Sequence, residues 1–146
     1  MKLFTEWLQD KVENYHPLSS GGSIMQHQQP QVDLYSAREG LKNSMANMRS
    51  NPMKWLGEGL ALAMQKVRGH RQAEEIIGNM QNIASRFFQE IRDRNLMIYD
   101  QRQGSVMTPR MPNEGERGFE DYQRLYLSYY NKLHAIWQNL DRLAAQ

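Results

Sequence analysis

The stretch of sequence that decides the fold is FEDYQRLYLSYYNKLHAIWQNLDRLAAQ, residues 119–146. Its apolar residues recur at spacings of three and four, which is the pattern of an amphipathic helix. The stripe consists of Phe119, Tyr122, Leu125, Tyr126, Tyr129, Leu133, Ile136, Trp137, Leu140 and Leu143. Tyr130 and Leu127 fall outside it, so the apolar surface is wider than one packed helix face needs. At 1.5 Å per residue this helix would be about 40 Å long, and we expect something else to pack along it.

Three further helices are predicted upstream, over residues 33–49, 52–68 and 72–96, each from a stripe of apolar residues with helical spacing. The sharpest boundary is Asn51-Pro52, because asparagine is a good N-cap and proline suits the first helical position. Gly69 suits the stop of the preceding helix. In the middle one of the three, the flank formed by Gly57, Gly59, Ala61 and Ala63 has little bulk, so another helix could approach closely.

The domain organisation is read from changes in composition. Residues 1–16 predict an amphipathic helix, residues 17–31 have the Ser, Gly, Gln and Pro content of a flexible linker, and residues 32–146 form the helical domain. Residues 100–118 read as a long irregular loop. Because no period-two pattern persists anywhere, we predict an all-α fold of about five helices: a small bundle with one long C-terminal helix and an N-terminal helix on a linker.

Apolar residues in the two irregular segments suggest that these segments are covered. Met25, Met107 and Met111 lie there among proline, glutamine and other polar residues, and not on a helical stripe. Since an apolar side chain gains free energy by leaving water, we expect these segments to lie against something.

Composition excludes several classes of protein. The 146 residues contain no cysteine, which rules out disulfides, thiolate metal sites and a cysteine nucleophile. The chain contains no run of about 18 apolar residues, so the sequence predicts no membrane span. The first 15 residues lack the basic start and apolar centre of a signal peptide. The expected location is therefore the cytoplasm or the inside of a virus particle, without secretion by a signal peptide.

Catalytic patterns are missing as well. His16, His27, His70 and His134 sit in four separate segments, and none has a partner at metal-ligand spacing. Glu74-Glu75 falls in the first turn of a predicted helix, where carboxylates favour the positive end of the helix dipole. We therefore predict no catalytic residue, no metal, no cofactor and no enzymatic activity.

The net charge of +2 is unevenly distributed. Residues 1–33 hold two basic against four acidic side chains, whereas residues 34–71 hold seven basic against two acidic ones. Lys66, Arg68 and Arg71 lie between two predicted helices and could reach one phosphate group together. We prefer the structural explanation, which is that basic side chains at the C-terminus of a helix offset the negative end of its dipole. A nucleic-acid-associated protein that uses the basic region 38–71 is the alternative reading.

The preferred reading is a non-enzymatic structural or adaptor subunit of a larger assembly, for example a minor component of a virion or a secretion machine. Its partners would be other protein subunits, in a homo- or hetero-oligomer. Large aromatic residues carry much of the energy of such contacts. The predicted interface anchors are Trp7, Tyr126, Tyr130 and Trp137.

Overall fold

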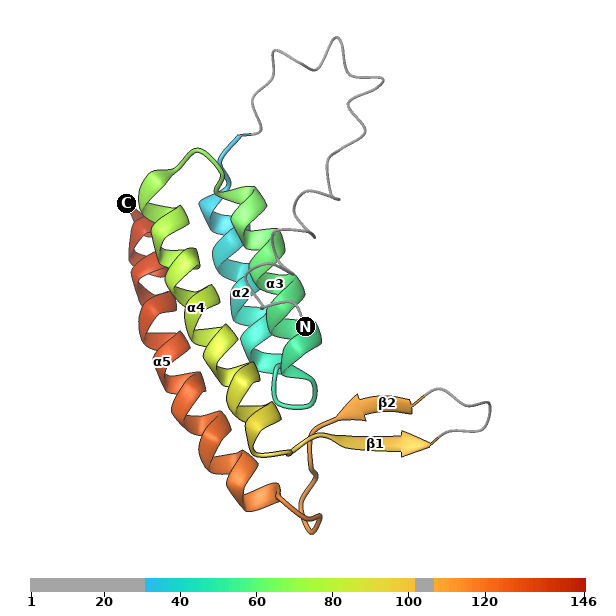
Figure 1. Cartoon of the computed structure of the whole chain (residues 1–146). Helices are drawn as coiled ribbons and strands as arrows, with labels where there is room; N and C mark the ends of the chain where they lie inside the picture. The colour runs from blue at the N-terminus through green and yellow to red at the C-terminus, as the bar shows by residue number, and fades with distance from the viewer. Residues whose placement is uncertain (1–30, 102–106) are drawn as a thin grey trace, which may run out of the picture.

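The computed structural model describes residues 31–101 and 107–146, and within them four helices form an antiparallel bundle (Figure 1). The helices are α2 (Leu34–Asn47), α3 (Pro52–Lys66), α4 (Arg71–Asp93) and α5 (Phe119–Ala145). Contacts between consecutive helices and between α5 and α2 close the ring. The predicted all-α class is confirmed. The predicted helix over 1–16 and, except for Gln31, the predicted linker over 17–31 lie outside the described residues.

Local capping fixes the ends of the helices. The Lys54 backbone N–H donates to the Asn51 side-chain oxygen at 3.2 Å, with Pro52 in the first turn, as the sequence predicts. Gly69 adopts a φ of 98° just after α3, a conformation that glycine tolerates best. His70 caps α4 by accepting from the Ala73 N–H at 3.3 Å, and Glu74 accepts from the Gly69 N–H at 2.6 Å. These two residues therefore act in capping.

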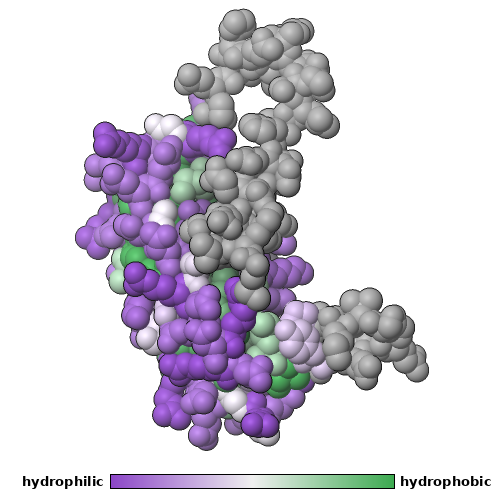
Figure 2. Space-filling model, viewed as in Figure 1, coloured by the Kyte–Doolittle hydropathy of each residue, from purple (hydrophilic) through white to green (hydrophobic). Residues whose placement is uncertain are grey.

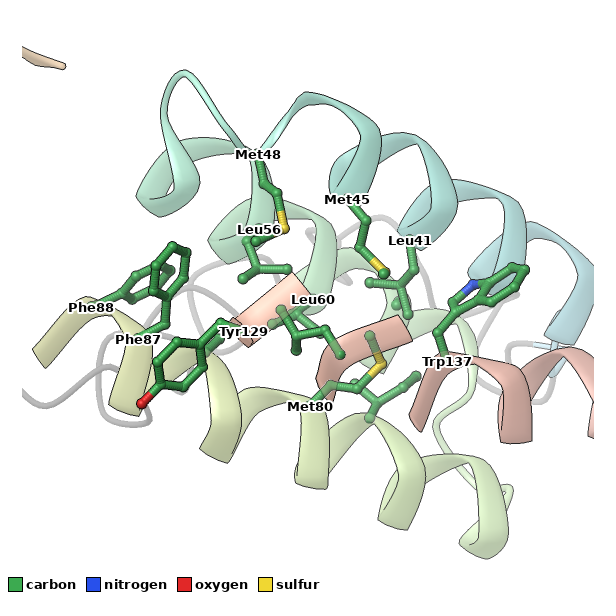
Figure 3. Packing of buried hydrophobic residues seen from close by; sticks show 14 of the residues in the cluster. Leu41, Met45, Met48, Leu56, Leu60, Met80, Phe87, Phe88, Tyr129 and Trp137 are labelled. Atoms are coloured by element: carbon green, nitrogen blue, oxygen red, sulfur yellow. The ribbon is translucent and has the colours of Figure 1, made fainter. Parts of the chain in front are cut away.

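One hydrophobic core fills the bundle (Figure 3). The Phe87 ring of α4 stacks on the Tyr129 ring of α5 with 5.0 Å between ring centroids, and Leu60 of α3 lies fully buried nearby. Three methionines fill space between the aliphatic side chains, namely Met45 of α2, Met48 at the end of α2 and Met80 of α4. Outside the core, Figure 2 shows a mostly hydrophilic surface on the visible face.

The small flank of α3 approaches α2 closely at Gly59. A Cβ atom built on Gly59 would lie 2.0 Å from the Ser44 Oγ and 2.6 Å from the Ser44 Cβ, distances too short for real contacts. Ser44 is itself buried. Glycine at position 59 is therefore what lets α2 and α3 pack at this separation.

The region 100–118 is not all loop. Strands β1 (Ile98–Gln101) and β2 (Met107–Arg110) pair antiparallel and project from the end of the bundle opposite to the C-terminus (Figure 1). No period-two pattern indicated these strands, because strands of four residues are too short to show alternation. Met111, just after β2, is buried in the core of the chain's own bundle. Met25 lies outside the described residues.

Candidate functional site: an aromatic and basic seam between α2 and α5

Helix α5 uses more than one face. Tyr122, Tyr129 and Leu133 point into the core and are almost fully buried. Tyr126 and Tyr130 are only half-buried and pack on the edge of the core, and His134 continues their row. The ring centroids are 5.8 Å apart from Tyr126 to Tyr130 and 5.9 Å apart from Tyr130 to His134. The result is a row of three partly buried rings along one side of α5.

This row faces α2, because two side chains of α5 next to it bond to one carbonyl group in α2 and one in the turn that follows α2. The Tyr122 hydroxyl donates to the Arg49 carbonyl oxygen at 2.5 Å, and the Trp137 Nε1–H donates to the Arg38 carbonyl oxygen at 3.0 Å. These carbonyls lie near opposite ends of α2. The side of α5 that carries the row is therefore fixed against α2 over the length of the shorter helix.

Trp137 is thus not an exposed anchor. Its side chain is 8% exposed, belongs to the hydrophobic core and has its only donor group bonded within the chain. The sequence predicted Trp137, like Tyr126 and Tyr130, as an interface anchor, since all three belong to a wide apolar surface. Contact with α2 covers Trp137 and leaves the two tyrosines only partly buried, so we do not retain Trp137 as an interface residue.

Helix α2 contributes basic residues to the same seam. Arg38 and Lys42 are four residues apart, which places them on one side of the helix, and Arg49 lies in the turn that follows its last residue, Asn47. Arg38 donates to the Asp141 carboxylate at 3.1 Å and to the Glu39 carboxylate at 3.0 Å. These contacts orient its guanidinium and partly offset its charge.

Arg49 lies against the aromatic row itself. Its guanidinium carbon is 5.5 Å from the Phe119 ring centroid and 6.0 Å from that of Tyr126, and it donates to the Gln123 amide oxygen at 2.5 Å. Lys42, between the two arginines, is exposed. We call the surface formed by Arg38, Lys42, Arg49, Tyr126, Tyr130 and His134 the α2–α5 seam.

At the hairpin end the seam opens into a hollow of about 550 Å³. Arg49 and Phe119 lie on its wall, and the segment after β2 forms the opposite side, with Met111, Pro112 and Asn113. Since a concave surface with mixed apolar and polar lining can receive a side chain of a partner, the hollow extends the area that the seam offers.

The seam and core tyrosines predict sensitivity to alkali. Burial raises the pKa of Tyr122 and of Tyr126, and burial together with the Glu90 carboxylate raises the pKa of Tyr129 to about 12. The unfolded chain ionises its tyrosines near pH 10. The pKa values of these tyrosines are thus higher in the folded chain than in the unfolded chain. Their contribution to the free energy of unfolding is therefore fully present below a pH of about 10 and is lost as the pH rises toward about 12.

Urea unfolding at a series of alkaline pH values measures this loss. The free energy of unfolding should stay level up to a pH of about 10 and then fall, and Tyr129→Phe should flatten the fall because it removes one of the ionising groups. A free energy of unfolding that stays level through pH 12 would contradict the expectation.

The other predicted site residues lie elsewhere. Trp7 is outside the described residues. Lys66, Arg68 and Arg71 are all exposed and lie where α3 ends and α4 begins. The Asp33 N–H donates to the Lys66 carbonyl oxygen at 2.8 Å, so this basic group lies near the start of α2, away from Arg49 and the hairpin. The structure therefore brings the three residues to one end of the bundle, separate from Tyr126.

Sequence reasoning missed His134 and the basic residues of α2 as parts of the seam. The spacing of Arg38, Lys42 and Arg49 could have placed them on one side of the predicted helix over 33–49. It could not show that this side lies next to α5, because that depends on the order of the helices around the bundle.

The described residues hold neither a metal-ligand cluster nor a membrane-spanning helix. No group of three or more His, Asp or Glu side chains in residues 31–101 and 107–146 could hold a metal ion. No helix in these ranges is both long and apolar enough to cross a membrane. Comparison of the chain with protein-family models, curated proteins and solved structures found no significant match.

Proposed function

We propose that this protein is a non-enzymatic structural or adaptor subunit that binds another protein through the α2–α5 seam. The observation that carries the proposal is the row of partly buried rings, Tyr126, Tyr130 and His134, bordered by Arg38, Lys42 and Arg49. Tyrosine and arginine are enriched among residues that dominate binding energy, because they combine large contact area with directed hydrogen bonds.

The seam also indicates the chemistry of the partner. An apolar strip on the partner would cover the aromatic row, and carboxylates beside that strip would meet Lys42 and the arginines. An amphipathic helix with an acidic border has this arrangement, and docking of such a helix in a groove is a common mode of recognition. A minor component of a virus particle or of a secretion machine is an example of a protein that works in this way.

Tyr130→Ala tests the proposal. The variant should retain the helicity and the cooperative unfolding of the wild type, because Tyr130 lies at the edge of the core, and it should lose most of its affinity for the partner. Tagged wild type and variant would be used to isolate bound proteins from the native source, and the affinity of the purified complex would then be measured by titration calorimetry.

Leu127→Ala is the matched control, since Leu127 is an exposed apolar residue on the same helix outside the seam. It should bind like the wild type. Loss of helicity in Tyr130→Ala would assign that residue to the core. Affinity for duplex DNA that falls steeply with salt, and that is lost when Lys66, Arg68 and Arg71 are replaced together by glutamine, would favour the nucleic-acid alternative.

A further inference from the structure

The two edges of the β-hairpin are chemically different. Tyr99 of β1 pairs with Pro109 of β2 in the antiparallel register. Proline has no backbone N–H, so this pair cannot be one of those that exchange two hydrogen bonds. It follows that Ile98 and Arg110 form the adjacent hydrogen-bonded pair, and that the N–H and C=O groups of Tyr99 point outward, away from β2.

The outer edge of β2 is poorly suited to further pairing. Pro109 points its nitrogen to that edge and offers no donor there, a device that is typical of protected sheet edges. Just after the strand, the Met111 N–H donates to the Ser50 carbonyl oxygen in the α2–α3 turn at 3.4 Å. In Figure 1, β2 lies on the side of the hairpin toward this turn, and β1 lies on the far side.

The base of the hairpin is firmly held. Two nitrogens of the Arg110 guanidinium donate to the two carboxylate oxygens of Glu116, at 2.6 and 2.7 Å, and the Asn113 N–H also donates to Glu116 at 2.7 Å. The hydrogen bond from the Arg110 side chain, and to a smaller extent the one from the Asn113 N–H, lower the pKa of Glu116 to about 2. The hairpin is thus presented to solvent in a fixed direction, with Tyr99 51% exposed on its open strand.

We propose that β1 pairs antiparallel with β1 of a second copy of this chain, through the outward N–H and C=O groups of Tyr99. A two-stranded sheet is marginal in water, whereas this pairing makes a sheet of four strands. The same edge serves both copies, as a two-fold interface requires. Both remaining edges would then carry Pro109, so the assembly stops at a dimer. The inference is independent of the α2–α5 seam.

Tyr99→Pro and Tyr99→Thr separate this pairing from other contacts. The proline removes the outward N–H without removing a β1–β2 hydrogen bond, whereas threonine keeps that N–H and suits a strand. Sedimentation of the full chain from about 10 µM to about 1 mM covers the affinities expected of a small interface. The wild type should shift from the 17.2 kDa monomer to a dimer, and Tyr99→Thr should do the same.

Tyr99→Pro should weaken the dimer by about tenfold or more, with circular dichroism unchanged. Hydrogen exchange of the Tyr99 amide in the wild type should slow as the concentration rises, which would place the contact at this edge. A wild type that stays monomeric at every concentration, or a Tyr99→Pro variant that dimerises like the wild type, would overturn the proposal. If the true partner of β1 were an extended peptide from another protein, the wild type would stay monomeric at every concentration.

Discussion

Replacing Trp137 with alanine should lower the free energy of unfolding by about 3–5 kcal/mol, the range typical of large aromatic side chains removed from a core. Two losses contribute to this effect. The side chain leaves a cavity beside α2, and the Arg38 carbonyl oxygen loses the indole N–H that bonds to it at 3.0 Å. Thermal or urea unfolding followed by circular dichroism measures the change.

Trp137→Phe separates the two losses. Phenylalanine keeps most of the ring and lacks the indole N–H, so the cost should include about 1 kcal/mol for the hydrogen bond and stay well below that of alanine. If Trp137→Ala unfolded at the same urea concentration as the wild type and bound its partner less tightly, Trp137 would be an interface residue after all.

Replacing Gly59 with alanine should destabilise the protein by about 1–3 kcal/mol, although alanine is the better helix former by about 1 kcal/mol. The new methyl group would overlap the Oγ and Cβ atoms of Ser44. The Oγ could rotate away, but the Cβ is fixed to the backbone of α2, so the two helices would have to separate. Urea unfolding again gives the magnitude.

Gly40→Ala is the matched control, because a Cβ at that position in α2 meets no atom within 4 Å. It should stabilise the protein by about 0.5–1 kcal/mol through helix propensity alone. The double replacement Ser44→Gly with Gly59→Ala restores space between the helices and should recover part of the loss. A Gly59→Ala protein as stable as Gly40→Ala would show that α2 and α3 are not in close contact here.

The helices were predictable because the signals that form them are local. Asn51 and Pro52 define the start of α3 by capping and by a fixed φ angle, and each apolar stripe marks the face that must leave water. The predicted ends still ran past the observed ones, by three residues at α4, where Asn95 takes a positive φ of 54° after the helix.

The hairpin and the seam were not predictable in the same way. Strands β1 and β2 are too short for alternation to stand out, and β2 contains a proline that counts against a strand in isolation. For the seam, the width of the apolar surface on α5 was evident, yet the sequence does not show which of the predicted anchors Tyr126, Tyr130 and Trp137 a neighbouring helix covers.

The sequence by itself determined the all-α class, the starts of the helices and the surplus of aromatic surface on the last one, because spacing and capping act within a few residues. Only the tertiary structure decided that α2 packs on the Trp137 edge of α5, that Gly59 meets Ser44 and that Met111 returns to the core. Each of these depends on which helix faces which. That choice is made by contacts between residues far apart in the chain, where the total buried surface and not the local pattern sets the free energy.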